Sequence, residues 1–317
     1  MTGPTMTTEQ LVEDVLNQMK KVSGGDEETA EALAAEAAEA PPEVAAPEAI
    51  TLDKKVVIRP NGQEYHVRKL GIHDDVAFIQ HCQKRMLAPL LTGPPGTGKT
   101  ALLEAAFTET GFYTLQGTGD TEVADFVGSY VPNGPDSFEW QDGPLLMAMD
   151  KGVPLYVDEI ALIDPKVMAL PYGVMDGRDE IVITANPSRG TVKAKPGFFI
   201  IASCNPNAPG ARMSEALLSR FGIQFEVKTD YKLAAKLGAD RKVVTAAQNL
   251  NTKVAKGEVG WAPQLRELLV YRDVAGEFGK DIALRNLVGC APEIDRTLVA
   301  DAITKAVGQE IHALDLA

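Results

Sequence analysis

The sequence has few features of a secreted or membrane protein. Its 317 residues include three cysteines, Cys82, Cys204 and Cys290, which are far apart, odd in number and not in a C-x-x-C pair. This pattern argues against a disulfide framework or a zinc site. The longest apolar runs are far too short to span a bilayer, and the first residues lack the basic start and apolar stretch of a signal peptide. We therefore expect a cytoplasmic protein without a membrane segment.

Positive charge is also scarce. The net charge is −13, and −9 of it falls in residues 1–50, where eleven acidic residues accompany two lysines. There is no basic stripe with interleaved aromatic residues, so a nucleic-acid partner is not expected. A few basic residues facing the pore of an oligomer would still be hidden in this average.

Changes in composition divide the chain into three parts. Residues 1–50 are acidic and rich in Ala and Pro, which predicts a largely disordered tail. An apolar face at about 8–22 predicts a short amphipathic helix that either packs on its own protein or docks on a partner. Residues 51–229 read as α/β and begin with a β-hairpin at about 55–68, around Pro60-Asn61-Gly62. Residues 230–317 read as a smaller all-helical domain.

Within the α/β part, five short apolar segments predict strands, with helical patterns between them. Strands that alternate with helices favour a parallel sheet with crossover connections. The predicted strands are Ala88–Leu91, Phe112–Gln116, Pro154–Asp158, Phe198–Ser203 and Ile223–Val227.

The strongest motif is GPPGTGKT, which follows the first of these strands and precedes the helical pattern ALLEAAF. Glycines let successive backbone N–H groups point at phosphate oxygens, and a following helix adds the positive end of its dipole. Lys99 is expected on the β and γ phosphates, and the Thr100 hydroxyl on Mg²⁺. The residues expected to bind the nucleotide are Gly93, Pro94, Pro95, Gly96, Thr97, Gly98, Lys99, Thr100 and Ala101.

Two further polar positions follow apolar strands. VPLYVDEI ends in an acidic pair, in which Asp158 is expected to hold Mg²⁺ through water and Glu159 to act as the base that activates water. Asn205, after GFFIIASC, is expected to position that water. An acidic pair at a strand end is often solvated surface, and Asn-Pro is a common turn. The upstream phosphate-binding motif favours the catalytic interpretation.

The order GPPGTGKT, VDEI, SCNP and LLSRFGIQFEV resembles the AAA+ ATPases. The stretch VGSYVPNGPDSFEWQDGPLLMAMDKG resembles the helix-2 insert hairpin of the MoxR-like, dynein-related branch, which includes midasin, NorQ, CbbQ and GvpN. The next stretch, from Ile163 to Ile200, resembles that branch's second hairpin before its sensor strand. The resemblance covers about residues 70–275. It implies a P-loop AAA+ domain with a parallel sheet, followed by a small helical lid.

The resemblance also implies roles and partners. Asn205 matches sensor 1, and Arg220 in LLSRF matches an arginine finger that acts on a neighbouring subunit's nucleotide. Arg266 in APQLRELL matches the sensor 2 arginine of the lid, although PQLR departs from the family spacing. ATP and Mg²⁺ are the implied cofactors, in a hexameric ring that remodels or activates a protein client. In MoxR-like systems such a client is often a von Willebrand A-type protein.

Two other functions stay open. One is a motor driven by a nucleoside triphosphate on nucleic acid, although Asn205 is not followed by the Thr-Ala-Asp of the GTP-driven restriction subunits. The other is a nucleotide-gated scaffold with little turnover. A scaffold would not need the full set of Asp158, Glu159 and Arg220.

Overall fold

The computed structural model describes residues 48–315, and from Ala49 onward these form one compact unit. The predicted helix at 8–22 and nearly all of the predicted tail lie outside the described residues.

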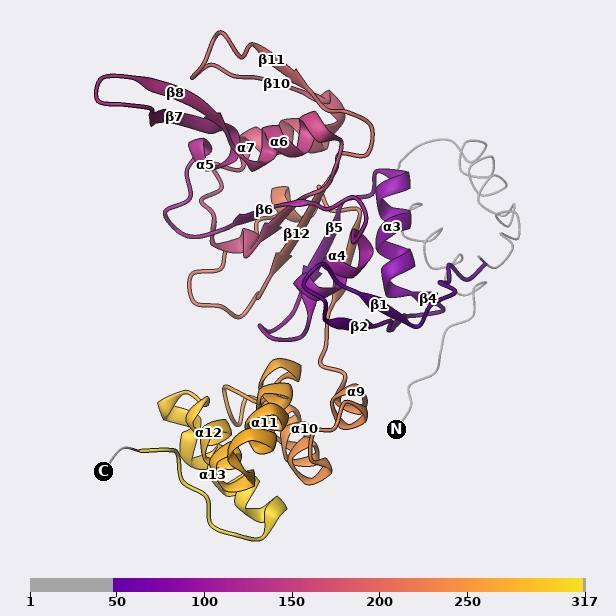
Figure 1. Ribbon diagram of the computed structural model, residues 1–317, viewed down its shortest axis with the longest axis vertical. Coiled ribbons are helices and arrows are strands. Elements are labelled where there is room, and N and C mark those ends of the chain that lie inside the picture. Colours follow the sequence, from indigo (N-terminus) through magenta and orange to yellow (C-terminus); the bar gives the residue numbers. More distant parts are fainter. Residues whose placement is uncertain (1–47, 316–317) are drawn as a thin grey trace, which may run out of the picture. The chain divides into compact units, whose positions relative to one another are not determined.

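A five-stranded parallel sheet forms the centre of the α/β part, in the order β13-β5-β12-β9-β6 (Figure 1). The five predicted strands are all present, with ends that differ by at most two residues. Their bounds are β5 (Pro89–Thr92), β6 (Tyr113–Gln116), β9 (Leu155–Asp158), β12 (Ile200–Cys204) and β13 (Ile223–Glu226).

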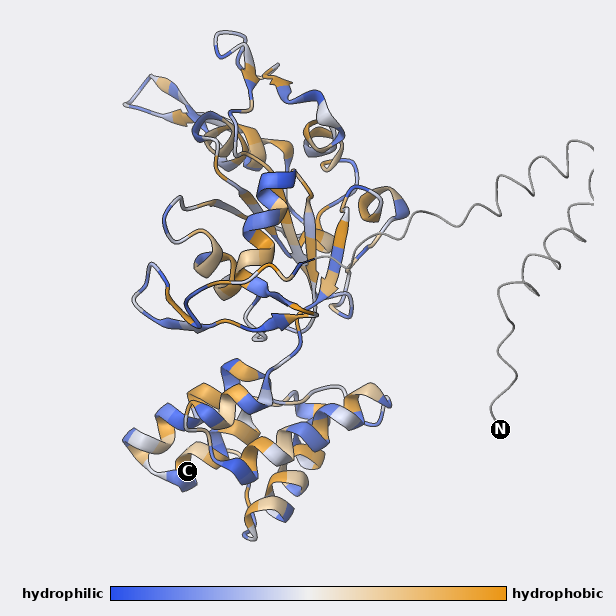
Figure 2. Cartoon of the chain, turned by 90° about the vertical axis from the view of Figure 1, so that its right-hand side faces the viewer, coloured by the Kyte–Doolittle hydropathy of each residue, from blue (hydrophilic) through white to orange (hydrophobic). Residues whose placement is uncertain are grey.

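The strands form because their apolar residues are covered on both faces of the sheet, as parallel sheets require. Every residue of the central strand β12 is buried. Figure 2 shows hydrophobic residues along the strands of the sheet, whereas the helices carry both hydrophobic and hydrophilic residues.

One face of the sheet packs against α3 (Asp75–Arg85) and α4 (Lys99–Ala106). Side chains alternate between the faces of a strand, so Tyr156 points to this face, whereas its neighbours Leu155 and Val157 point to the other. The face with Tyr156 is therefore the one that carries the helix of the phosphate-binding motif.

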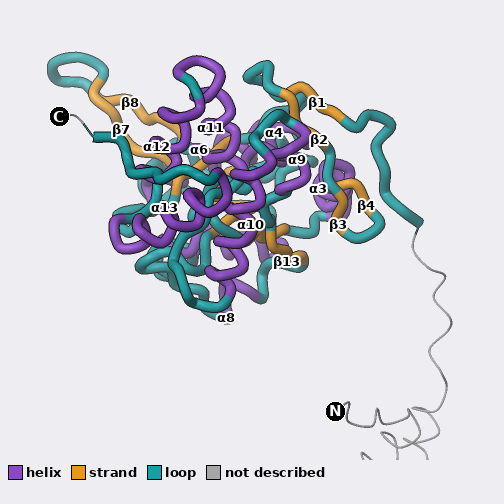
Figure 3. Tube along the Cα trace, turned by 90° about the horizontal axis from the view of Figure 1, so that it is seen from below, coloured by secondary structure: helices purple, strands orange, loops and turns teal. Residues whose placement is uncertain are grey.

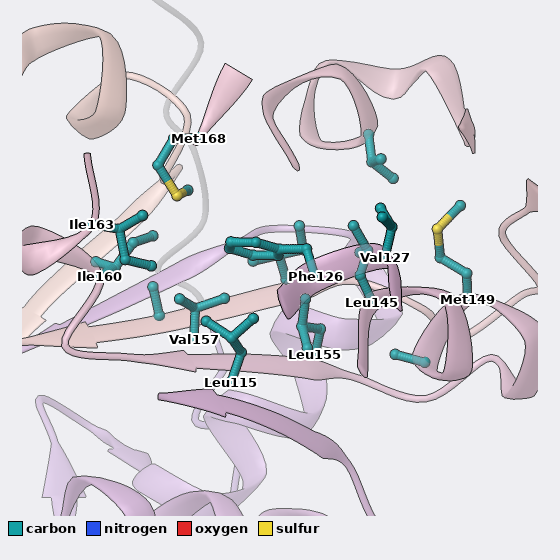
Figure 4. Close-up of a cluster of buried hydrophobic side chains, with 14 of the residues drawn as sticks. Leu115, Phe126, Val127, Leu145, Met149, Leu155, Val157, Ile160, Ile163 and Met168 are labelled. Atoms are coloured by element: carbon teal, nitrogen blue, oxygen red, sulfur yellow. The ribbon is translucent and has the colours of Figure 1, made fainter. Parts of the chain in front are cut away.

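The other face packs against α5 (Val123–Val127) and α6 (Pro144–Lys151). Figure 4 shows Phe126 of α5 among side chains from α6 and from strands β6 and β9. Pro144 occupies the first turn of α6, where its missing N–H costs no hydrogen bond, and Gly152 ends the helix in the left-handed conformation.

Four antiparallel strand pairs surround the sheet. Hairpin β7–β8 lies in the predicted helix-2 insert, and hairpin β10–β11 precedes β12; Figure 1 shows both near α6 and α7. The pairs are β1 (Val56–Ile58) with β2 (Glu64–His66), β3 (Lys69–Leu70) with β4 (His73–Asp74), β7 (Gly128–Pro132) with β8 (Phe138–Asp142), and β10 (Glu180–Val182) with β11 (Thr191–Lys193).

Short helical segments connect the later strands. They are η1 (Ile160–Leu162), α7 (Ala169–Gly173), η2 (Val174–Arg178) and α8 (Glu215–Leu218).

After Glu226 the described residues contain helices and no strand (Figure 3). These helices share a core of their own, in which Leu250, Leu268, Leu287 and Val299 are almost fully buried. Their bounds are α9 (Tyr231–Lys236), α10 (Arg241–Ala255), α11 (Leu265–Phe278), α12 (Lys280–Gly289) and α13 (Glu293–Val307). The predicted fold class, a P-loop AAA+ α/β domain followed by a small helical part, is confirmed.

Candidate functional site

The phosphate-binding motif forms the turn from β5 into α4. Gly93 has a φ of 135°, and a Cβ built there would lie 2.7 Å from the carbonyl oxygen of Val227. Only glycine fits this backbone conformation and this close approach to the chain after β13. Gly96 and Gly98 also have positive φ, so the loop curls over the start of α4. The N–H groups of the first turn of α4 lie at this curl, as an anion site requires.

Lys99, the first residue of α4, is 7% exposed. Its Nζ donates hydrogen bonds to the carbonyl oxygens of Gly93 (2.8 Å) and Pro94 (3.0 Å). Burial lowers the pKa of Lys99, and the nearby carboxylates of Glu159 and Asp158 act in the opposite direction. The ammonium group therefore lies inside the loop, where a phosphate chain would replace carbonyl oxygens as its partner.

Asp158, the last residue of β9, is oriented by three hydrogen bonds to one oxygen. Its Oδ1 accepts from the Tyr156 hydroxyl (2.8 Å), from the Glu159 N–H (3.1 Å) and from the Ser203 hydroxyl. Within the described residues, no hydrogen bond ends on Oδ2. The carboxylate is thus fixed through Oδ1, and Oδ2 is available to a metal ion or its water ligand.

Glu159 has an unusual backbone conformation, with φ 51° and ψ 42°. This left-handed region is uncommon for a residue other than Gly, Asn or Asp, and such strain often accompanies functional sites. The Glu159 Oε2 accepts a hydrogen bond from the Asn205 N–H at 3.2 Å. The sharp turn after β9 therefore brings the predicted base to the end of the neighbouring strand β12.

The Asn205 side chain has a different partner from its backbone. Its Oδ1 accepts from the Asn207 N–H at 3.1 Å, and the Ala208 N–H donates to the Asn205 carbonyl at 3.0 Å. The amide therefore stabilises a turn directly beside Glu159. Asn205, the predicted sensor 1 residue, is therefore part of a turn. A water-positioning role for its amide stays a prediction.

A cleft of about 370 Å³ opens over the phosphate-binding loop. The predicted site residues that line it are Pro95, Gly96, Thr97, Gly98, Lys99, Thr100, Ala101, Asp158, Glu159 and Arg266. The Arg266 N–H donates to the Gly96 carbonyl oxygen at 3.1 Å, which joins α11 to the loop. Strand β2 and four leucines of the helical part also line the cleft, together with Arg59, Gln63, Arg68 and Glu104; the leucines are Leu233, Leu237, Leu265 and Leu269. The cleft thus has a polar end at the loop and an apolar end at the leucines.

Arg220, after α8, is not among the residues that line this cleft. Its guanidinium forms an ion pair with Asp176 (3.0 Å) and lies 4.1 Å from the centre of the Tyr172 ring. The structure therefore holds Arg220 against α7 and η2, at a place separate from its own phosphate-binding loop. An arginine that acted on its own nucleotide would have to lie in the cleft.

Arg68 is a cleft residue that the sequence analysis missed. It donates from Nε to Tyr65 and to Asp75 (3.1 and 3.3 Å) and from one terminal nitrogen to the Thr97 carbonyl oxygen (3.1 Å). Burial opposes the charge on Arg68, but Tyr65 and Asp75 outweigh it and the pKa of Arg68 is raised. Arg68 thus ties the segment after β2 to the loop, and no local motif marks it.

Tyr156 and Ser203 were also missed. Both are fully buried, and their hydroxyl oxygens lie 2.8 Å apart beside Asp158. The alternation of side chains along a strand was a usable signal, because Tyr156 lies two residues before Asp158 and so shares its face. Ser203 could not be placed without knowing that β12 lies next to β9.

The oxygen donors at the polar end suit Mg²⁺. The Tyr156 hydroxyl lies 2.8 Å from Asp158 and 3.5 Å from the Thr100 hydroxyl, so both predicted ligands lie around one buried group. Among residues 48–315 there is no cluster of three or more His, Cys, Asp or Glu side chains that could hold a metal alone. Mg²⁺ commonly takes one or two protein oxygens together with substrate phosphates, which matches this donor set.

A parallel sheet, a glycine-rich loop that leads into a buried lysine, and an acidic pair at the adjacent strand end define a P-loop nucleotide-binding protein. Residues 89–221 match the family of AAA domains of the dynein-related subfamily. The chain belongs to this AAA+ family, and the resemblance drawn from its motifs is confirmed.

The relatives support the family without supplying an activity. The chain is 31% identical over 234 residues to an uncharacterized protein of Staphylococcus saprophyticus, a match that covers 67% of this chain and 85% of that one. Uncharacterized proteins of Staphylococcus haemolyticus and Staphylococcus aureus strain USA300 are each 35% identical. These matches cover 51% and 45% of this chain, and 61% and 55% of theirs.

Among solved structures, the chain is similar to a "putative ATPase" of Cytophaga hutchinsonii. It has 15% sequence identity and a TM-score of 0.42, over 74% of this chain and 84% of that one. Separately, none of the helices between residues 48 and 315 combines the length and apolarity needed to cross a bilayer.

Proposed function

We propose that this protein binds ATP with Mg²⁺ and hydrolyses it to ADP and phosphate. The observation that carries the proposal is the convergence of Lys99, Asp158 and Glu159 on the polar end of one cleft. Lys99 and the loop N–H groups would hold the phosphates, and Thr100 and Asp158 would hold Mg²⁺. The metal would neutralise charge on the β and γ phosphates.

In this scheme Glu159 accepts a proton from the attacking water. Its position next to the Asn205 N–H fixes one carboxylate oxygen and leaves the other for the water. Arg266, on the first turn of α11 and next to Gly96, would contact the phosphates from the helical part. Such a contact would make the helical part respond to the nucleotide.

We further propose that each site is completed by Arg220 of a neighbouring copy in a hexameric ring. Arg220 is held against Asp176 and Tyr172 and away from its own cleft, so it is available to a neighbour. An arginine supplied in trans can accelerate phosphoryl transfer by orders of magnitude. Hydrolysis per subunit should therefore rise with protein concentration until rings are fully assembled.

Mixing two inactive variants tests the shared site. Arg220→Ala and Glu159→Gln should each be nearly inactive alone, because one lacks the finger and the other lacks the base. In a mixed ring, an Arg220→Ala subunit with an intact Glu159 can face the intact Arg220 of a Glu159→Gln neighbour. Some activity should therefore return at intermediate ratios.

Arg241→Ala is the matched control, because Arg241 is an exposed arginine on α10. It should be active alone and should not restore activity to Arg220→Ala beyond its own contribution. If fluorescence transfer shows subunit exchange and no activity returns on mixing, the shared site is wrong. Unchanged activity per subunit down to dilute monomer would also contradict it.

We propose a protein as the client, with a von Willebrand A-type protein as the expected kind. The support is family membership together with hairpin β7–β8, where Tyr130 is 51% and Phe138 is 67% exposed. Large exposed apolar side chains on a hairpin suit a protein surface better than a phosphate backbone. A cytoplasmic location is proposed because the thiols of Cys82 and Cys204 are buried and free.

Hairpin β7–β8 is tied to the segment between β10 and β11. Arg189 pairs with Asp142 at the end of β8 and with Asp150 of α6, and the Trp140 indole N–H donates to Asp142 at 2.7 Å. A Glu159→Gln protein held in ATP should capture the client, and Phe138→Ser in that background should lose it. Capture that is unaffected by Phe138→Ser would argue against this surface.

A further inference from the structure

A fully buried pair of hydroxyl groups lies directly beneath the two predicted Mg²⁺ ligands. The Tyr156 hydroxyl is 2.8 Å from Asp158 Oδ1, 2.8 Å from the Ser203 hydroxyl and 3.5 Å from the Thr100 hydroxyl. The Ser203 hydroxyl also contacts Asp158 Oδ1. Four oxygen-bearing side chains from β9, β12 and α4 therefore meet around one point.

The number of hydroxyl protons in this group determines which oxygen donates in each hydrogen bond. Tyr156 and Ser203 have one hydroxyl proton each, and a carboxylate can only accept. Both protons can go to Asp158, or Tyr156 can donate to Ser203 and Ser203 to Asp158. In either arrangement Tyr156 has no proton left for Thr100, so the Thr100 hydroxyl donates to the Tyr156 oxygen.

The reverse arrangement, with Tyr156 donating to Thr100, is disfavoured. It would leave the Tyr156 and Asp158 oxygens only 2.8 Å apart with no proton between them, in a site without solvent contact at Tyr156. When Thr100 donates to Tyr156, its oxygen lone pairs point away from that contact and toward the cleft. Asp158 is held through Oδ1 in the same way, which leaves Oδ2 for the metal or its water.

We propose that Tyr156 and Ser203 are positioning residues for Mg²⁺, which set the Thr100 hydroxyl and the Asp158 carboxylate in the orientation that binds the metal. The inference rests on the proposed ATP and Mg²⁺ function and adds two residues to it. Partners that orient metal ligands typically change metal affinity by roughly 10–100-fold when they are removed. Tyr156 and Ser203 are not among the residues that line the cleft.

The distinguishing property is the gain in nucleotide affinity that Mg²⁺ brings. The experiment measures binding of mant-AMPPNP, a fluorescent ATP analogue that is not hydrolysed, to the full chain in excess Mg²⁺ and in excess EDTA. The dissociation constant in EDTA divided by the dissociation constant in Mg²⁺ isolates the metal's contribution. Tyr156→Phe removes one hydroxyl group without removing the ring, and Ser203→Ala removes the other.

We expect each variant to lower this ratio by roughly tenfold, while the dissociation constant in EDTA stays near that of the wild type. Tyr271→Phe is the matched control, because Tyr271 is a nearly buried tyrosine in the helical part. It should leave both constants unchanged. If Tyr156→Phe does not fold, Ser203→Ala still tests the proposal, because it removes the other hydroxyl group independently.

Three results would overturn the inference. Both affinities could stay at their wild-type values, or the affinity in EDTA could fall as much as the affinity in Mg²⁺, which leaves the ratio unchanged and would make the hydroxyls merely structural. Alternatively, Tyr271→Phe could lower the ratio equally. A wild-type chain that fails to bind mant-AMPPNP under either condition would instead refute the proposed function, and the inference with it.

Discussion

Replacing Arg68 tests how the structure supports its phosphate-binding loop. The Arg68 side chain faces Asp75, whose carboxylate is 7% exposed, and the arginine side chain is itself 15% exposed. Removing one partner of a buried ion pair costs about 3–5 kcal/mol, because the remaining charge stays buried without compensation. Asp75 would keep bonds from the Tyr65 hydroxyl and from the N–H groups of Arg68 and Val76. We therefore expect Arg68→Ala to fall at the lower end, about 3 kcal/mol.

The assay is urea unfolding of the full chain, followed by tryptophan fluorescence. With a slope of about 1–3 kcal/mol per M, a loss of 3 kcal/mol lowers the midpoint by about 1 M or more. Arg241→Ala should change stability by less than about 0.5 kcal/mol, because it alters an exposed side chain. Adding Asp75→Asn to Arg68→Ala should recover part of the loss, because the uncompensated charge is then gone.

Nucleotide affinity gives a second measurement on the same variant. Arg68 also donates to the Thr97 carbonyl oxygen, so its loss should loosen the loop and weaken ATP binding. An Arg68→Ala protein that unfolds within about 1 kcal/mol of the wild type would refute the reasoning. An Arg68→Ala/Asp75→Asn protein that loses more stability than the two single variants together would refute it too.

Two further substitutions have clear expected outcomes. The Leu52 N–H, Lys69 and Lys55 bind Asp74 and lower its pKa. The ionised Asp74 therefore stabilises the folded state above the unfolded pKa, near about 4, and this stabilisation is lost as the pH falls. Asp74→Asn should therefore destabilise the protein at neutral pH, with a difference that shrinks below about pH 4; a constant difference down to low pH would contradict this. Gly93→Ala should cost at least about 1–3 kcal/mol, from positive φ and the clash with Val227. Gly111→Ala, where nothing lies within 4 Å of the added carbon, should cost clearly less, and equal losses would refute the role of the close approach.

The fold could be predicted because its signals are local. The five strands are short apolar segments, and the loop from Gly93 to Thr100 has a sequence pattern tied to its geometry. Strand ends shifted by a residue or two, because hydrogen bonding to neighbouring strands decides where a strand stops. Cys204, for example, pairs with Thr92 and so extends β12 beyond Ser203.

The supporting residues of the site could not be predicted in the same way. Arg68 acts on Thr97 from 29 positions away, and Ser203 meets Asp158 across 45 positions. Such contacts depend on strand order and on side-chain direction, which a single sequence does not state. The roles of Asn205, Arg220 and Arg266 rest on the family pattern and stay predictions, of which the Arg220→Ala mixing experiment tests that of Arg220.

The central claim, that Glu159 activates water for ATP hydrolysis at this cleft, is tested most directly by measuring phosphate release and ATP binding together. We expect the wild type to release phosphate from ATP in the presence of Mg²⁺. Glu159→Gln should bind ATP as tightly as the wild type and release phosphate very slowly, whereas Lys99→Ala should lose binding itself. A Glu159→Gln protein that keeps near-wild-type turnover would contradict the claim, as would a wild-type protein that binds ATP and releases no phosphate at any concentration.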